Sequence, residues 1–567
     1  MTPQPRMTEV LRIGNVSGFY GDRFDAVAEM LGGGEIDVLT GDYLAELTML
    51  ILGRDRMANE NLGYAKTFLR QMRESLGPAL ARGVRIVVNA GGLNPAGLAA
   101  ALRELAAELG LEARIAHVEG DDLRPRAAEF GFGEPLTANA YLGCWGIVAC
   151  LEAGADVVVT GRVTDAALVM GPAAAHFGWG TTDYDRLAGA LAAGHVIECG
   201  TQATGGNFSF FTELGDLRRP GFPIAELRAD GSSVLTKHPG TGGAVTTETV
   251  TAQLLYEIAE PAYRNPDVTA RFDTVRLREL AQDRVELSGT RGEAPPRTVK
   301  VCLNTLDGFR NAMTFVLCGL DIEAKAELVE RQLRAEFPDD ELIFDLARTD
   351  RADAETEQLA SALYTATIRT PDPKRADRFS RAAVELALAS YPGFTMTSPP
   401  GKGSPVGVYT PGYVDRAAIQ QYAVLPDGTR EPIPHPVDDP GETVAGQPEA
   451  VTEPVGGATI SAPLGRVLGA RSGDKGGDAN LGVWARDELG YRWISGHLTV
   501  ARLRELLPET ADLEIERFEL PNLRALNFVI HGLLGKGVAA STRFDPQAKS
   551  LGEWFRSRVA DIPEVLL

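Results

Sequence analysis

The fold of this chain follows from one stretch, Val157-Val158-Val159-Thr160-Gly161-Arg162-Val163-Thr164-Asp165-Ala166-Ala167-Leu168-Val169-Met170. Its three β-branched residues form a short apolar run, which predicts a strand buried in a parallel sheet. A polar turn follows, and then a helix with Thr164 or Asp165 as its N-cap. Open α/β sheets place their binding sites where a strand ends in such a turn. The stretch therefore predicts a site here, and the alternative is an ordinary helix cap with a surface arginine.

The same strand–turn–helix pattern occurs upstream at residues 10–31, 36–52 and 85–109, and a further strand is predicted over 113–118. This repetition predicts an α/β fold with an open, mostly parallel, doubly wound sheet. Parallel strands bring their carboxyl ends to one edge, so we expect the residues after each strand to line one cleft. The alternative is that they are turn residues and helix caps. The candidate binding residues at these strand ends are Asn15, Ser17, Asn89, Gly91, Gly92, Asn94, Arg162 and Thr164.

Three kinds of chemistry are expected at this edge. Arg162 is suited to hold a carboxylate or a phosphate. Asp165 or Asp42 is the expected base, provided that burial raises its pKa. The backbone amides of Gly91-Gly92 and Gly205-Gly206 are expected to stabilise an enolate oxygen.

Two glycine-rich loops follow the predicted sheet. The first, after a strand expected over 195–200, combines hydroxyls, amides and adjacent glycines, and its candidate binding residues are Gln202, Thr204, Gly205 and Asn207. The second, over 237–243, contains His238 as a third catalytic candidate, although a histidine beside a proline is more often structural. Neither loop has the spacing of an ATP-binding P-loop, and the turn Gly14-Asn-Val-Ser-Gly18 is not a dinucleotide fingerprint. The cofactor is therefore left unassigned.

The turn Glu119-Gly120-Asp121-Asp122 contains three carboxylates in four residues. Such a turn can bind a divalent cation, but a solvated loop is the favoured interpretation. A metal-dependent lyase that uses Asp121, Asp122, Asp165 and Glu198 is the weakest of the functions considered, and no metal site is assigned.

The composition changes along the chain and predicts four regions: an α/β sheet domain over 1–270, an α+β segment over 271–430 that completes the large domain, a proline-rich linker over 431–463, and a separate domain over 464–567. Helices are expected over 59–76 and 139–153, and separate strands over 297–303 and 312–320. The last region has the order β-β-α-β-β-α, which predicts a ferredoxin-like sandwich. Its predicted loop over 471–480 is either a site or surface decoration, with Lys475, Asp478 and Asn480 as candidates.

The overall charge limits the partners. The 567 residues include 56 Lys and Arg against 77 Asp and Glu, a net charge of −21, which argues against nucleic-acid and anionic-membrane binding. Five dispersed cysteines predict reduced thiols. No apolar signal segment or membrane-length run is present, so a cytoplasmic protein is expected. A homo-oligomer is expected from base rates alone.

Five motifs together resemble the acyclic terpene utilisation family, AtuA: Gly14-Asn-Val-Ser-Gly18, Gly41-Asp-Tyr-Leu44, Asn89-Ala-Gly-Gly92 with Asn94-Pro95, Gly161-Arg-Val-Thr-Asp165 and Arg471-Ser-Gly-Asp-Lys-Gly-Gly-Asp-Ala-Asn480. The resemblance covers the large domain and the ferredoxin-fold domain of longer members. It implies a place in the catabolism of acyclic terpenes such as citronellol and geraniol. There the family accompanies a geranyl-CoA carboxylase, an isohexenylglutaconyl-CoA hydratase and acyl-CoA dehydrogenases, and related members accompany other branched acyl-CoA pathways.

Two functions follow from these observations. The first is an enzyme that acts on a carboxylate or an acyl-CoA thioester by hydration, dehydration, isomerisation or hydrolysis, with CoA as part of the substrate. A lyase or isomerase is favoured over a serine hydrolase, because no GxSxG elbow is present, and over an NAD-dependent dehydrogenase. The second is a non-catalytic binding or scaffolding subunit of an acyl-CoA carboxylase or enoyl-CoA hydratase complex.

Overall fold

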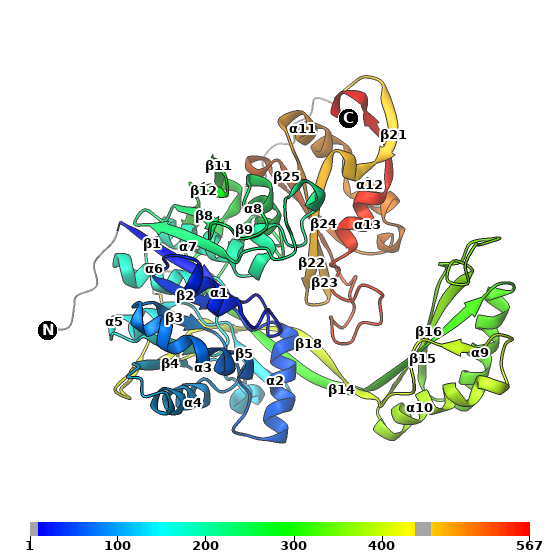
Figure 1. The fold of residues 1–567 in the computed structure, drawn as a ribbon, viewed down its shortest axis with the longest axis horizontal. Helices are drawn as coiled ribbons and strands as arrows, with labels where there is room; N and C mark the ends of the chain where they lie inside the picture. Colours follow the sequence, from blue (N-terminus) through cyan, green and yellow to red (C-terminus); the bar gives the residue numbers. More distant parts are fainter. Residues whose placement is uncertain (1–8, 437–454) are drawn as a thin grey trace. The chain divides into compact units, whose positions relative to one another are not determined.

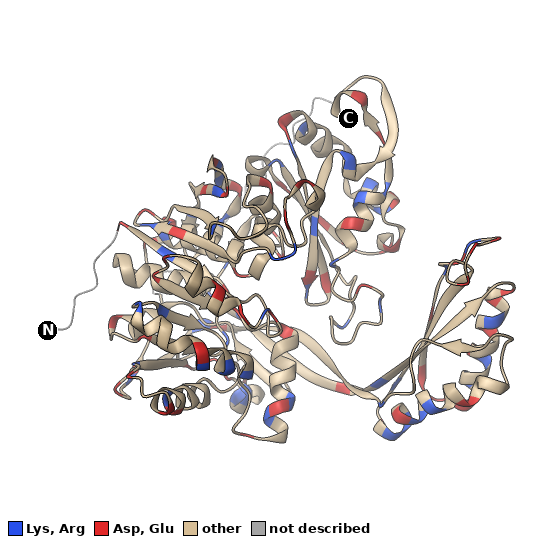
Figure 2. Cartoon of the chain, viewed as in Figure 1, with Lys and Arg blue, Asp and Glu red and all other residues tan. Residues whose placement is uncertain are grey.

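A computed structural model describes residues 9–436 and 455–567. The chain forms two compact units. The first contains the described residues up to Asn304 together with Tyr409–Val538 and Asp545–Leu567, and the second contains Thr305–Val408 and Ala539–Phe544. Acidic and basic residues are interspersed throughout the described chain (Figure 2).

In the described part of the chain, eleven strands of the first unit form one sheet in the spatial order β11-β12-β8-β7-β1-β2-β3-β6-β4-β19-β20 (Figure 1). In chain order these strands are β1 Val10–Asn15, β2 Val38–Gly41, β3 Arg85–Val88, β4 Ile115–Glu119, β6 Val157–Thr160, β7 Pro223–Arg228, β8 Ser233–Lys237, β11 Arg276–Ala281, β12 Arg284–Ser288, β19 Tyr422–Val424 and β20 Arg430–Pro432.

Only the centre of this sheet is parallel. The pairs β1–β2, β2–β3, β3–β6 and β6–β4 run parallel, and the flanking pairs are antiparallel. The predicted α/β class is found, but a mostly parallel sheet is not, because the antiparallel hairpins β7–β8 and β11–β12 extend one flank and the hairpin β19–β20 extends the other. Residues 276–288, expected in the α+β segment, therefore belong to the large sheet.

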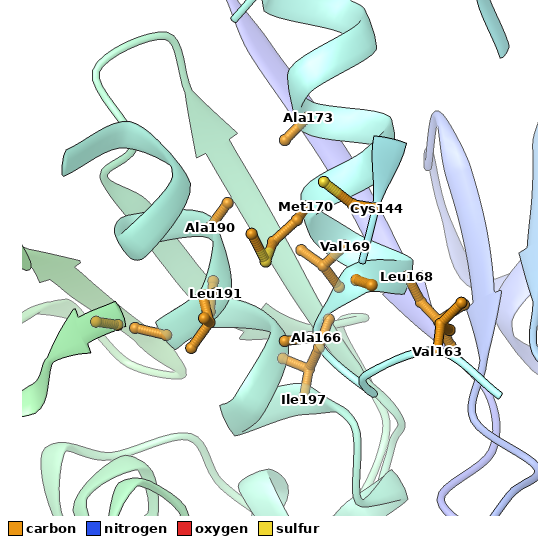
Figure 3. Close-up of a cluster of buried hydrophobic side chains, with 14 of the residues drawn as sticks. Cys144, Val163, Ala166, Leu168, Val169, Met170, Ala173, Ala190, Leu191 and Ile197 are labelled. Carbon is orange, nitrogen blue, oxygen red and sulfur yellow. The ribbon is translucent and has the colours of Figure 1, made fainter. Parts of the chain in front are cut away.

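Alternate side chains of the central strands bury into two cores. In β6, Val158 joins one core, and Val157 and Val159 join the other. The first core contains side chains of α5, α6 and α7, and the second contains side chains of α1, α3 and α4. Figure 3 shows part of the first core, with side chains of α6, such as Met170, and of α7, such as Leu191. This explains why β6 consists of apolar residues without alternation. The helices of the unit's N-terminal part are α1 Ala26–Gly33, α2 Glu46–Ala58, α3 Lys66–Ala81, α4 Pro95–Glu108, α5 Trp145–Glu152, α6 Ala167–Phe177, α7 Tyr184–Ile197 and α8 Thr247–Leu254.

Several predicted elements were wrong. The helix expected over 139–153 is a short strand, β5 (Thr137–Ala140), followed by α5, because Asn139 lies in a strand that pairs with β14. The strand expected over 195–200 is the end of α7, which is buried on all sides and so lacks a helical pattern. The helix expected over 59–76 begins only at Lys66.

The strands expected over 297–303 and 312–320 form one continuous strand, β14 (Thr298–Cys318). Its residues Val301–Asn304 pair with β5, and Phe309–Cys318 pair with β16. The remaining elements that follow α8 up to residue 415 are β9 Ala262–Arg264, β10 Thr269–Arg271, β13 Arg291–Glu293, α9 Ile322–Glu336, β15 Glu341–Ala347, β16 Ser361–Thr370, α10 Pro373–Glu385, β17 Thr395–Met396 and β18 Ser404–Asp415.

The C-terminal part contains the predicted β-β-α-β-β-α elements, but with two helices, α11 and α12, in place of the first one and with an additional strand pair, β21–β26, at its two ends. Its antiparallel sheet has the order β22-β23-β25-β24. The loop expected over 471–480 is mostly strand, because β22 and β23 continue until only Gly476 and Gly477 remain as the turn. The linker predicted over 431–463 lies largely outside the described residues. The elements here are β21 Thr459–Pro463, β22 Leu468–Lys475, β23 Asp478–Ala485, α11 Glu488–His497, α12 Val500–Leu506, β24 Ile515–Leu520, β25 Ala525–Ile530, α13 Leu551–Ser557 and β26 Val559–Pro563.

Candidate functional site

The turns after β2 and β3 hold two polar side chains against each other. Asn89 Nδ2 donates to Asp42 Oδ1 at 2.6 Å, and Asn89 Oδ1 accepts from the Tyr43 N–H at 2.7 Å. The Leu44 N–H also donates to Asp42 Oδ1, at 3.1 Å. Both side chains are buried, so the neighbouring parallel strands fix this carboxyl group from two sides.

The turn after β6 places a buried arginine beside a carboxyl group. Arg162 Nη1 donates to Asp165 Oδ1 at 2.9 Å and to the Leu44 carbonyl at 3.2 Å, and its guanidinium lies 4.2 Å from the centre of the Tyr141 ring. The Arg162 N–H donates to Asp121 Oδ2 at 2.9 Å. Its side chain is only 3% exposed. The alternative of a surface arginine is therefore wrong, and Arg162 fixes the position of Asp165.

A group not anticipated from the sequence lies next to this pair. Tyr141 Oη donates to Glu46 Oε1 at 2.8 Å, and Lys300 Nζ lies 3.6 Å from the same oxygen. Lys300 Nζ is also 4.8 Å from the Tyr141 ring centre and 5.6 Å from that of Tyr409. Burial alone would raise the pKa of Glu46, but the charges of Lys300 and Arg162 lower it to about 2. These residues come from distant parts of the chain, so no local pattern indicates them.

The end of α7 contributes a further carboxyl group, which lies beside a histidine. His195 Nδ1 lies 3.3 Å from Glu198 Oε1, and both side chains are buried. Asn15 Nδ2 donates to the carbonyls of Ile197, at 2.8 Å, and Glu198, at 3.0 Å, which joins the end of β1 to this segment. Burial lowers the pKa of His195 to about 4, so its ring is neutral at pH 7.

The C-terminal domain also reaches this region. Lys475, at the end of β22, donates from Nζ to the Glu257 carbonyl at 2.8 Å. Asn480 Oδ1 accepts from the Glu257 N–H at 2.9 Å, and its Nδ2 donates to the Leu255 carbonyl at 3.1 Å. Lys549 Nζ lies 3.3 Å from Glu257 Oε1. The predicted candidates Lys475 and Asn480 are thus brought to the end of α8.

We call the ionisable groups that act electrostatically on one another here the charged cluster. Burial raises the pKa of Asp42, Asp165 and Glu198, and mutual repulsion adds to this effect. Solvent nevertheless reaches about a quarter to a third of the Asp165, Glu46 and Lys300 side chains. The charged cluster consists of Asp42, Glu46, Arg162, Asp165, Glu198, Glu257, Lys300 and Lys475.

Other candidates serve local structure. His238 Nε2 lies 2.9 Å from the Met30 carbonyl, where it holds α1, and takes no part in the charged cluster. Asn94 caps α4 by accepting from the Gly97 N–H at 2.9 Å. Ser17 Oγ donates to the Phe19 carbonyl, Thr204 Oγ1 to the Gly221 carbonyl, and the Thr164 N–H to the Leu142 carbonyl. Asp478 accepts from the Gly532 N–H and lies 3.1 Å from His531.

Three of the four expected oxyanion amides donate hydrogen bonds within the chain. The Gly92 N–H donates to the Asn89 carbonyl, the Gly205 N–H to Gln202 and the Gly206 N–H to Thr201. Gly91 is required because a Cβ atom would lie 2.4 Å from the Thr160 carbonyl oxygen. In the loop that follows α7, Gln202 Oε1 and the Asn207 carbonyl both accept from Arg471 of the C-terminal domain.

The turn that follows β4 is not a solvated loop. Asp121 is buried and accepts from the Arg162 N–H and from Asn139 Nδ2, and Asp122 pairs with Arg56 at 3.3 Å. Burial raises the pKa of Asp121 to about 7. Among the described residues, no three His, Cys, Asp or Glu side chains are arranged so that they share a metal ion. Asp121 instead positions the arginine of the charged cluster.

These features define a two-domain α/β protein with a charged cluster at the ends of its parallel strands. A family model described as "Acyclic terpene utilisation family protein AtuA" matches residues 11–425, and one described as "AtuA ferredoxin-like domain" matches residues 462–559. The chain therefore belongs to the AtuA family, as the sequence motifs indicated, and has a role in acyclic terpene utilisation. A search of curated proteins gives no match. In the described ranges, no helix has the length and apolar character needed to cross a membrane.

Proposed function

We propose that this protein is an enzyme of acyclic terpene or branched acyl-CoA catabolism that moves protons on a carboxylate or acyl-CoA substrate. The reaction class is a hydration, dehydration or isomerisation. The observation that carries this proposal is the set of three carboxyl groups, those of Asp42, Asp165 and Glu198, whose pKa burial raises. A carboxyl group with a raised pKa exchanges protons efficiently near neutral pH.

Two further features support this class of reaction. Asp165 combines a raised pKa with an accessible side chain, and Arg162 holds it at 2.9 Å. Lys300 lies 3.6 Å from Glu46 and Lys549 lies 3.3 Å from Glu257, and lysines of this kind neutralise a carboxylate or an enolate oxygen. Active sites typically contain several desolvated ionisable groups, although desolvating them costs folding free energy.

The test is exchange of substrate protons for deuterium. The purified protein is incubated in D₂O with acyl-CoA thioesters and free branched acids, and exchange at the carbon next to the carbonyl is followed by NMR. We expect exchange with at least one substrate, and a loss of at least tenfold in Asp165→Asn. The matched control is Asp183→Asn, because Asp183 also pairs with an arginine three residues away, Arg186, at 3.0 Å, but at the surface.

The alternative outcome is equally specific. Tight binding of a thioester without exchange, together with co-purification of an acyl-CoA carboxylase or hydratase at fixed stoichiometry, would replace the enzyme proposal with that of a non-catalytic subunit.

A further inference from the structure

The glycines of the β22–β23 hairpin allow it to approach α8 closely. A Cβ atom on Gly473 would lie 2.6 Å from Cε2 of Tyr256, and one on Gly476 would lie 2.9 Å from Cε1 of Tyr409. Gly476 also has a φ of +69°, which suits glycine in a two-residue turn. Asp474 and Lys475 lie between these glycines. They are consequently held against the large N-terminal domain and not in open solvent.

The segment that receives this hairpin is strained. Glu257 follows α8 and has a φ of +56°, a conformation that costs free energy for any residue other than glycine. Its N–H donates to Asn480 and its carbonyl accepts from Lys475, so both of its backbone groups are held by the C-terminal domain. Strain maintained by a second domain is typical of functional segments.

Groups from several elements act on the Lys475 amine. Burial and the positive charge of Lys300 in β14 lower its pKa to about 8, against the opposite effect of three carboxyl groups. These are Glu257 after α8, Glu46 in α2 and Glu198 after α7. Lys475 is thus an amine that is partly neutral near physiological pH, in a site lined by carboxyl groups.

We propose that Lys475 is the base of this site, so that the catalytic groups are divided between the two domains. This inference rests on the proposed function and assigns one of its roles. In the step, the neutral amine takes a proton from the substrate carbon next to the carbonyl, which gives an ammonium group and an enolate. The ammonium group then returns a proton to the enolate, at the same carbon or, in an isomerisation, at a carbon conjugated with it. No oxidant or reductant is needed.

Lys475→Arg separates this role from a structural one. Arginine keeps the positive charge and a donor for the Glu257 carbonyl, but it does not deprotonate. We expect Lys475→Arg to fold, to retain the thermal shift given by bound thioester, and to lose deuterium exchange by at least a hundredfold. Exchange within threefold of the wild type would overturn the proposal. The matched control is Lys325→Arg, since Lys325 also donates to a backbone carbonyl, that of Cys318 at 2.7 Å, in the second unit.

A second measurement does not depend on turnover. Limited acetylation with an amine-reactive ester between pH 6.5 and 9.5, read by mass spectrometry of peptides, gives the titration of each lysine. We expect Lys475 to titrate near pH 8 and to be protected by bound thioester. A Lys475 that reacts no faster than Lys325 at pH 7.5 would overturn the inference. If the wild type shows no exchange with any substrate, the proposed function fails instead, whatever the lysine titration shows.

Discussion

The contact between Gly473 and Tyr256 gives a direct test of the two-domain site. In Gly473→Ala, the new Cβ atom would lie 2.6 Å from Cε2 of Tyr256 and 3.3 Å from Cγ of Glu257. Tyr256 is only 3% exposed, and its ring lies between the charged groups of Arg471, at 4.4 Å, and Lys549, at 4.6 Å. The ring therefore has little room to move, and the hairpin itself must shift.

The expected cost follows from two opposing effects. Overpacking of this kind costs about 1–3 kcal/mol. Replacing glycine by alanine also restricts the unfolded chain, which recovers about 0.4–1 kcal/mol. We expect Gly473→Ala to lower the free energy of unfolding by about 1–2 kcal/mol. The shift of the hairpin also weakens the bonds of Lys475 and Asn480 to Glu257, and so reduces ligand binding.

Chemical unfolding measures the stability change, and hydrogen exchange of the Glu257 amide reports the hairpin contact. The control is Gly496→Ala in α11 of the same domain, where a Cβ atom would have no neighbour within 4 Å. That substitution is expected to be neutral or to stabilise the helix by up to about 1 kcal/mol. If Gly473→Ala were as stable as Gly496→Ala, with unchanged exchange at Glu257, the close approach described here would be refuted.

Two other substitutions test the same structure. Asn480→Ala leaves the Glu257 N–H and the Leu255 carbonyl without their side-chain partner. Chemical unfolding should show that the free energy of unfolding falls by about 2–4 kcal/mol, and a fall below about 1 kcal/mol would contradict the role of these two hydrogen bonds. Burial raises the pKa of Asp267 from 3.8 to about 6, so the stability that its uncharged form confers is complete below pH 4 and is lost as the pH rises through 6. Asp267→Asn should therefore gain about 2.4 kcal/mol relative to the wild type between pH 4 and pH 7, measured by unfolding at both pH values, and an equal difference at the two would contradict the shift.

The local part of the site could be predicted from the sequence. Asp42, Asn89, Arg162 and Asp165 each follow a strand of the parallel centre, and parallel pairing alone brings such positions to one edge. His238 was instead a candidate from a glycine-rich loop, and it follows an antiparallel strand, β8, at the flank of the sheet, where it lies against the Met30 carbonyl. A residue type that suits catalysis is equally suited to a cap or a turn, and only its partners distinguish the two.

The rest of the site depends on pairings that no local pattern encodes. Lys300 and Tyr409 lie on the long strands β14 and β18, and Glu257 and Lys549 meet only because the C-terminal domain contacts the end of α8. The interpretation of 471–480 as a loop concealed this contact. Its charged residues resemble a surface turn, but β22 and β23 pair as far as Lys475 and Asp478, and the two glycines then make the turn.

The free-energy cost of burying the charged cluster indicates that the chain keeps it for function and not for stability. Burying ionised groups costs several kcal/mol each, and an apolar contact of similar volume is often as stable or more stable. The chain instead places Asp42, Asp165 and Glu198 where burial raises their pKa, and holds Glu257 in a left-handed conformation. The C-terminal domain offsets this strain through Lys475 and Asn480. A domain used only for external contacts would not need two of its polar side chains bonded to the backbone of a single strained residue beside those carboxyl groups. A domain that completes an active site would need such bonds, because they hold that residue in place.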